Sequence, residues 1–226
     1  MFLLTSKILA GPFAGKLTNS EGAMARKSKR KPSEKRTTPI ALRIIGGHYR
    51  GRKLKYSGDP GVRPMKDRVR EALFNLLGPA IKETYAIDLF GGTGALGLEA
   101  ISRGATGAHI IEFHQPTARV IEENIATLEL QDRTTLKTMS AFDWLDSNPT
   151  LPDARWAVFI SPPYRYYVEE RETMMKMIQT ILDRAPRNSL ISIEATNEFD
   201  FAQLPDAEEW DVRTYSPAVV GVYVCP

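Results

Sequence analysis

Two segments of this sequence combine residue types and spacings that can do chemistry. The first is the glycine-rich run Asp88-Leu89-Phe90-Gly91-Gly92-Thr93-Gly94, and the second is Ser161-Pro162-Pro163-Tyr164. Each run directly follows an apolar stretch typical of a buried strand. Glycines let ligand atoms approach the backbone closely. In a parallel α/β sheet both segments would meet at the carboxyl edge, where such sheets bind ligands.

The glycine run predicts a nucleotide-like ligand. Gly92, Gly94 and Gly97 have the spacing of a dinucleotide fingerprint, and Glu112 follows Gly92 by 20 residues, where a ribose-binding acid is expected. The pattern alone permits NAD. Asp88 argues against NAD, because a carboxylate at the strand end repels a pyrophosphate and pairs with the ammonium of an amino-acid group. S-adenosylmethionine has that ammonium and no phosphate, so we expect it as the cofactor.

The remaining contacts of this cofactor follow from the strand ends. We expect Glu112 to accept both ribose hydroxyls, a contact that NAD would share, and the backbone of Ser140 and Ala141 to touch the adenine. Phe142 or Trp144 would flank the ring. The complete predicted set comprises Asp88, Phe90, Gly91, Gly92, Thr93, Gly94, Glu112, Phe113, Ser140 and Ala141.

The second segment predicts a catalytic role for Ser161, Pro162, Pro163 and Tyr164. Two successive prolines stiffen the turn, so one side-chain oxygen and one backbone carbonyl can be aimed at the two hydrogens of an exocyclic amine, while Tyr164 stacks on its base. The nitrogen lone pair then points at a methyl group. The sulfonium already activates that methyl, so the protein supplies mainly proximity and alignment. Ser161 is expected to orient the amine and not to deprotonate it.

The composition excludes several classes of protein. Of 226 residues, 42% are hydrophobic and 25% charged, which excludes a wholly disordered or fibrous chain. The single cysteine, Cys225, excludes an intramolecular disulfide and a multi-cysteine zinc site. No apolar run reaches the roughly 18 residues that a membrane helix needs. We expect a cytoplasmic protein with no metal and no membrane partner.

The net charge of +3 hides an uneven distribution. Residues 1–71 contain 18 basic and 5 acidic residues, whereas the other 155 contain 12 basic and 22 acidic residues. This division indicates nucleic-acid binding at the basic end. Residues 1–42 lack apolar periodicity, so we interpret them as a flexible basic arm outside the core, with Met24 as an alternative start. The charge run within residues 24–36 is equally typical of a solvated tail.

Strands and helices alternate through most of the remaining chain, 43–226, which we expect to form one domain. Within an extension over residues 43–80, the run 43–56 predicts a small basic hairpin, and a stripe of apolar residues from Val69 to Leu77 predicts a helix that ends before Gly78. Further strands are expected at 85–90, 108–113, 134–139, 156–160, 189–195, 210–215 and 219–224, and helices at 95–103, 116–130 and 168–184. This alternation predicts a doubly wound α/β fold with a mostly parallel sheet, closed by an antiparallel hairpin.

These residues together resemble the RsmD-type methyltransferases, which modify a guanine N2 amine in bacterial 16S ribosomal RNA. The most specific similarities are Arg43-Ile44-Ile45-Gly46-Gly47, Arg50-Gly51-Arg52-Lys53-Leu54, the segment from Arg63-Pro64 to Asn75, Asp88 to Ala100, and Ile111-Glu112. The resemblance implies a class I, Rossmann-like fold of seven strands, S-adenosylmethionine as methyl donor, 16S rRNA in an assembling small subunit as substrate, and a monomer. This chain departs from the family at Ser161, His114 and Ser140. Serine at position 161 is familiar from enzymes that methylate cytosine N4.

The basic side chains of the extension are expected to grip RNA phosphates while the target base is read in the crevice. They are Arg43, Arg50, Arg52, Lys53, Arg63, Lys66, Arg68 and Arg70. Three alternatives remain open at this point. They are a DNA or other RNA amino-methyltransferase acting on cytosine N4 or adenine N6, a NAD-dependent oxidoreductase, and a catalytically silent RNA-binding protein.

Overall fold

The computed structural model describes residues 42–59 and 61–226. The arm expected at residues 1–42 lies outside this part of the chain except for Leu42. That residue is buried, and its carbonyl accepts a hydrogen bond of 2.9 Å from the N–H of Leu54. Leu42 therefore belongs to the packed core, from which the sequence analysis excluded it.

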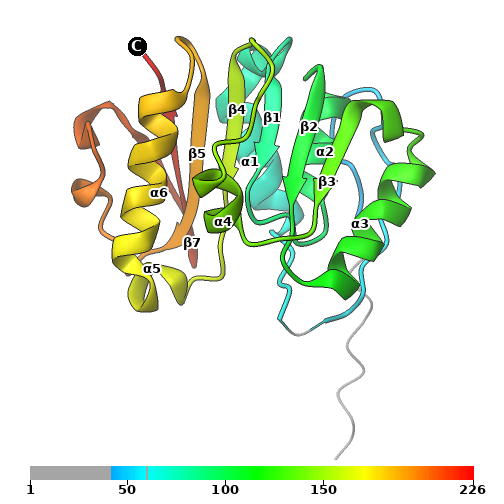
Figure 1. The fold of residues 1–226 in the computed structure, drawn as a ribbon, viewed down its shortest axis with the longest axis horizontal. Coiled ribbons are helices and arrows are strands. Elements are labelled where there is room, and N and C mark those ends of the chain that lie inside the picture. Colours follow the sequence, from blue (N-terminus) through cyan, green and yellow to red (C-terminus); the bar gives the residue numbers. More distant parts are fainter. Residues whose placement is uncertain (1–41, 60) are drawn as a thin grey trace, which may run out of the picture. The chain divides into compact units, whose positions relative to one another are not determined.

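A seven-stranded sheet forms the centre of the described residues, in the order β3-β2-β1-β4-β5-β7-β6 (Figure 1). The strands are β1 Tyr85–Asp88, β2 Gly107–Ile111, β3 Thr134–Lys137, β4 Trp156–Ile160, β5 Leu190–Thr196, β6 Asp211–Tyr215 and β7 Ala218–Val224. β1 to β5 pair in parallel, and β7 runs antiparallel to both β5 and β6. The predicted mostly parallel sheet with a closing antiparallel hairpin is confirmed.

The first helix, α1 Asp67–Leu77, precedes β1. The helices that connect the parallel strands are α2 Ala95–Ser102, α3 Gln115–Thr127, α4 Ala141–Asp146, α5 Tyr166–Glu169 and α6 Arg171–Arg184. Short 3-10 helices cover Gly78–Ile81, Gln131–Arg133, Phe201–Gln203 and Ala207–Glu209. The single helix predicted at 168–184 is interrupted at Glu170, where the backbone leaves the helical region at φ −121° and ψ 31°. α4 was not predicted, because six residues are too few to show a helical period.

Apolar residues of the strands alternate between two cores, one on each face of the sheet. Ala86 of β1 and Phe159 of β4 pack in the core that includes α1, α2 and α3. Ile87 and Val158 pack in the other core, with α4 and α6. Figure 1 shows α4 and α6 in front of the sheet and α1 behind it. This alternation is the period of two that a strand buried on both faces must have.

The strand order also fixes where a ligand can bind. The chain leaves β1 toward β2 and β3 on one side, and β4 then pairs on the other side of β1. A crevice opens at such a reversal, beyond the carboxyl ends of the two strands. The glycine run follows β1 directly and Ser161 follows β4, so the fold places both predicted segments at this reversal.

Candidate active site

A cavity of about 860 Å³ lies at the carboxyl edge of the sheet. Its walls come from the β1–α2 loop, the ends of β2, β4 and β5, and the segment 61–70 that enters α1. The predicted cofactor and catalytic residues that line it are Phe90, Gly91, Gly92, Thr93, Glu112, Phe113, Ser140, Ala141, Ser161, Pro162, Pro163 and Tyr164. The fold therefore brings the two segments together around one cavity, as predicted. Asp88 and Gly94 do not line it.

Gly94 and Gly97 determine the backbone conformation where the glycine-rich loop ends and α2 begins. Gly94 precedes α2 with φ of +74°, a conformation that is strained for residues with a side chain. A Cβ on Gly97 would lie 2.9 Å from Cγ1 of Ile110, so only glycine allows α2 to approach β2 this closely. The close approach also lets the Gly97 N–H donate a 3.1 Å hydrogen bond to Oδ2 of Asp88.

The structure places Asp88 beneath the cavity and not in its wall. Its side chain is fully buried, and Oδ1 has no hydrogen-bond partner among the described residues. Burial raises the pKa of Asp88 to about 7, and the Gly97 N–H opposes this shift. Its Oδ2 is turned to the backbone of α2 and supports the start of that helix. The expected pairing of Asp88 with a ligand ammonium stays a prediction.

Glu112 links the glycine loop to β2. Its Oε2 accepts a 2.7 Å hydrogen bond from the N–H of Gly92, and its Oε1 accepts one of 2.7 Å from the N–H of His114. Burial raises the pKa of Glu112, while these backbone donors lower it. Each carboxylate oxygen has a second lone-pair site. Glu112 can therefore hold the loop and still accept hydrogen bonds from two hydroxyls of a ligand.

Aromatic side chains form the wall beside the ends of β2 and β4. Phe113 is 69% exposed and lines the cavity. Phe90, Phe142 and Tyr166 lie 6.0–6.1 Å apart between ring centroids and also line it. Trp144, the other residue considered for a stacking role, is buried in the core. The Ser140 hydroxyl accepts from the Phe142 N–H and so caps α4.

The Ser161–Tyr164 segment surrounds a carboxylate that the sequence analysis missed. The Ser161 hydroxyl donates to Oε2 of Glu194, and the Tyr164 hydroxyl donates to Oε1 at 3.1 Å. Glu194 lies near the end of β5, where Ile160 of β4 pairs with Ile193. Burial raises the pKa of Glu194, and both hydroxyls and the charge of Arg63 oppose this shift. The pKa of Tyr164 rises to about 12, through burial first and the Glu194 charge second.

A sequence signal for Glu194 was available. It is the one acidic residue in the apolar run Leu190–Thr196, and it falls at the carboxyl end of the strand beside β4. A lone carboxylate inside a buried strand is costly unless it is paired or functional. Because 156–160 and 189–195 are predicted as successive parallel strands, and successive strands usually lie side by side, this signal would have placed Glu194 near Ser161.

The basic residues expected to contact RNA divide into two groups. Seven are exposed, and of these Arg63 and Lys66 line the cavity. The exposed residues are Arg43, Arg50, Arg52, Lys53, Arg63, Lys66 and Arg68. Arg70 is fully buried, so its prediction as an RNA contact is wrong. It lies on the face of α1 that packs against the core, next to Val69 and three residues before Leu73, which are also buried.

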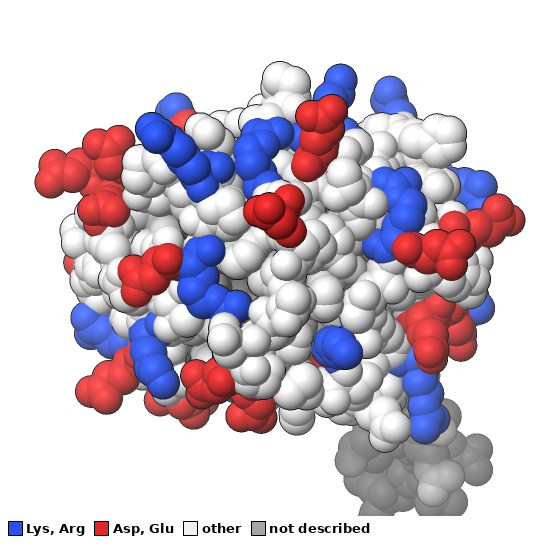
Figure 2. Space-filling view, turned by 45° about the horizontal axis from the view of Figure 1, so that its top comes forward, with Lys and Arg blue, Asp and Glu red and all other residues white. Residues whose placement is uncertain are grey.

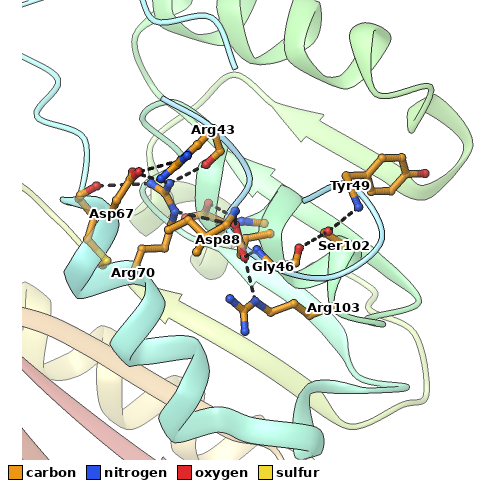
Figure 3. A network of polar contacts seen from close by, with 12 residues as sticks. Arg43, Gly46, Tyr49, Asp67, Arg70, Asp88, Ser102 and Arg103 are labelled. Atoms are coloured by element: carbon orange, nitrogen blue, oxygen red, sulfur yellow. Dashed lines mark hydrogen bonds and ion pairs between the residues drawn. The ribbon is translucent and has the colours of Figure 1, made fainter. Parts of the chain in front are cut away.

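Arg70 belongs to a polar network that ties the extension to α2 (Figure 3). Its guanidinium donates to the carbonyl of Arg43 at 2.7 Å and to Asp67 at 3.0 Å. On the other side, the buried carboxylate of Glu99 accepts hydrogen bonds of 2.7 Å from both Ile45 N–H and Gly46 N–H. The predicted hairpin is present as a loop closed by one antiparallel bridge between Arg43 and Lys53.

The charges on the surface are mixed. On the face that Figure 2 shows, Lys and Arg side chains lie among Asp and Glu side chains, without one continuous basic patch among the described residues drawn there. Within residues 42–59 and 61–226, no group of three or more His, Cys, Asp or Glu side chains could hold a metal ion. None of the helices in this part of the chain has the length and apolar character needed to cross a membrane.

Comparison with known proteins places this arrangement among methyltransferases. A family described as "Conserved hypothetical protein 95" matches residues 42–224. Ribosomal RNA small subunit methyltransferase D of Escherichia coli (strain K12) is 38% identical over 165 residues, which cover 73% of this chain and 79% of that protein. The family match over residues 42–224 contains all the residues that line the cavity.

Solved structures show the same fold. The structure of yhhF from Escherichia coli is 32% identical, with a TM-score of 0.68, and the match covers 81% of this chain and 97% of that one. An RNA methyltransferase from Salinibacter ruber, solved in complex with S-adenosyl-L-homocysteine, has a TM-score of 0.55 at 14% identity, over 73% of this chain and 94% of that one. At that identity the likeness concerns the fold alone.

Proposed function

We propose, from the premise that this chain belongs to the ribosomal RNA small subunit methyltransferase D family, that it methylates a guanine N2 amine in small-subunit rRNA. Membership in the family makes the chain an S-adenosylmethionine-dependent methyltransferase with a class I, Rossmann-like fold. It sets aside the NAD-dependent oxidoreductase and the silent RNA-binding protein that the sequence left open.

The cavity residues fit S-adenosylmethionine better than a dinucleotide. The Gly92 N–H, which would face a phosphate in a dinucleotide loop, already donates to Glu112. A pyrophosphate would meet this carboxylate, whereas ribose hydroxyls can donate to its remaining lone pairs. Glu112 would hold the ribose, Phe113 would cover the adenine, and the Phe90–Thr93 backbone would approach the amino-acid part. When bound, this cofactor supplies a methyl group activated by a sulfonium.

The chain's own residues then align the amine that accepts the methyl. The Ser161 hydroxyl hydrogen is directed to Glu194, which leaves the Ser161 oxygen free to accept an N–H from the amine. Pro162 and Pro163 stiffen the turn so that this oxygen stays in place. After the N–C bond forms, the nitrogen is cationic and strongly acidic, so its proton passes to water and no strong base is required.

We expect the exposed basic residues to supply the grip on RNA. Arg63 and Lys66 lie at the cavity itself, where they can hold the phosphates that flank a base turned out of its stack. The other exposed cations of the extension would contact the backbone farther away. An assembling small subunit as the substrate, action as a monomer and a cytoplasmic location remain predictions of the family resemblance.

One observation carries this proposal: the Ser161–Tyr164 segment and the Glu112-anchored glycine loop line the same cavity. The test is transfer of a tritiated methyl group to unmodified 16S rRNA, as naked transcript and as reconstituted small-subunit particle, followed by nucleoside mass spectrometry. We expect N2-methylguanosine, and a rate reduced at least about 100-fold in Ser161→Ala. Ser147→Ala, on the surface beside α4, is the matched control and should keep full activity.

Other outcomes would contradict the proposal. Labelled duplex DNA with unlabelled rRNA would identify a DNA amino-methyltransferase, and N4-methylcytidine or N6-methyladenosine would identify a different target base. Size-exclusion chromatography with light scattering checks the monomer, since a stable dimer would give twice the chain mass of 25.3 kDa.

A further inference from the structure

Glu194 is held at the active site by residues from two elements. Its carboxylate receives the hydroxyls of Ser161 and Tyr164, and the Tyr167 hydroxyl donates to its backbone carbonyl at 2.9 Å. The side chain is only 9% exposed, yet it lines the cavity. Three hydroxyl donors around one residue fix both its backbone and its side chain. Such rigid placement of a polar group is needed where a site must read a ligand edge.

The carboxylate has accepting capacity left after these contacts. An ionised carboxylate offers about four lone-pair sites, and Ser161 and Tyr164 use one on each oxygen. Arg63 adds a positive charge that favours the ionised form. Glu194 therefore presents unused acceptors to the cavity directly beside the Ser161 oxygen.

These acceptors match guanine among the bases with an exocyclic amine. The pairing edge of guanine carries two adjacent kinds of donor, N1–H and the N2 amine. The pairing edges of adenine and cytosine place an unprotonated ring nitrogen beside their amine, and its lone pair would face the carboxylate. A buried acceptor that meets another acceptor loses its hydrogen bond and keeps its desolvation cost. Sites built on such contacts reject the wrong ligand strongly.

We propose that Glu194 selects guanine by accepting its N1–H, while Ser161, oriented by Glu194, accepts an N–H of the N2 amine. This inference rests on the proposed function and adds a specificity-determining residue to it. The pair acts as one unit, because the Ser161 hydrogen is committed to Glu194 and the Ser161 oxygen is thereby kept as an acceptor.

The test compares guanine with 2-aminopurine at the target position, once mass spectrometry has mapped it. 2-Aminopurine keeps the N2 amine but has an unprotonated N1 and no O6, so the contact to N1 is isolated by comparing the preference of the wild-type protein with that of Glu194→Gln. Ligated rRNA carrying either base is assembled into particles, and kcat/KM is measured for each. The wild-type protein should prefer guanine by at least about 100-fold. Glu194→Gln should lower kcat/KM on guanine at least about 100-fold and reduce the preference to below about 10-fold, because its amide N–H can donate to the bare N1.

Control measurements separate this inference from folding and from the proposed function. Glu198→Gln, exposed just beyond β5, should keep the wild-type preference, and calorimetry with S-adenosylhomocysteine should show unchanged binding to Glu194→Gln. A wild-type preference below about 3-fold, or a Glu194→Gln preference equal to wild type, would overturn the inference even though guanine is methylated. Failure of the wild-type protein to methylate guanine at all would overturn the proposed function, and the inference with it.

Discussion

The guanidinium of Arg70 and the carboxylate of Glu99 face each other at 4.0 Å, with both side chains fully buried. Arg70 comes from the extension and Glu99 from α2, so this pair lies where the two parts of the chain meet. Arg103 also donates to Glu99 at 2.8 Å, and Nε of Arg70 has no hydrogen-bond partner among the described residues. The basic extension is thus attached through buried charges as well as through apolar contacts.

The first prediction concerns this attachment. Glu99→Gln should lower the free energy of unfolding by about 3 kcal/mol, because it leaves the buried Arg70 charge with only the partly exposed Asp67 as a charged partner and weakens two backbone hydrogen bonds. Chemical denaturation measures the change. The same substitution at Glu71, exposed on α1, should alter stability by no more than about 0.5 kcal/mol. Equal effects of the two substitutions would contradict the role assigned to Glu99.

The second prediction concerns Asp88 and pH. Its pKa is about 7 in the folded protein and near the ordinary 3.8 when unfolded, so between these values the folded state holds a proton that the unfolded state has lost. The free energy of unfolding of the cofactor-free protein should therefore fall as the pH rises from 4 to 8. Asp88→Asn removes this component and should match wild type near pH 4 but exceed it by up to roughly 4 kcal/mol near pH 8.

Denaturation series at several pH values test the Asp88 prediction. Asp132→Asn, on an exposed 3-10 helix, should differ from wild type by the same amount at every pH. A difference between Asp88→Asn and wild type that does not grow with pH would show that Asp88 is ionised in the folded protein already at low pH.

The sequence predicted the elements more completely than the side-chain contacts. The mostly parallel sheet, its closing hairpin and the meeting of Gly92 with Ser161 followed from the apolar runs and the alternation of elements, which are local signals. The sequence did not predict where the side chains of Arg70 and Asp88 point, because a charged residue gives the same sequence signal whether it faces solvent or a buried partner. Arg70 is buried by the close approach of α1 and α2, and Asp88 by the close approach of α2 to the sheet, both of which only the tertiary packing sets. Glu194 could be assigned to the site only after both β5 and the neighbouring β4 had been placed in the sheet.

The third prediction concerns the cofactor. Glu112→Gln replaces an acceptor oxygen by an N–H₂ group, so one of the backbone donors of Gly92 and His114 loses its partner and a ribose hydroxyl loses its acceptor. Affinity for S-adenosylhomocysteine should fall by roughly 10- to 100-fold, since hydrogen bonds to charged groups contribute about 1.5–3 kcal/mol. Isothermal titration calorimetry measures it. Glu122→Gln, exposed on α3, should bind as wild type does, and NADH should give no heat with either protein.

The fourth prediction concerns RNA. Arg63 and Lys66 are exposed at the cavity, so neutralising both as Arg63→Gln and Lys66→Gln should weaken binding of small-subunit rRNA at low salt. Each phosphate contact contributes about 0.7–0.9 to the slope of log affinity against log salt concentration. The double variant should therefore have a slope smaller by about 1.4–1.8, which filter binding over a series of salt concentrations can resolve. Arg187→Gln, exposed before β5 at the opposite edge of the sheet, should leave the slope unchanged. Equal slopes for the double variant and wild type would mean that RNA approaches the cavity from another side.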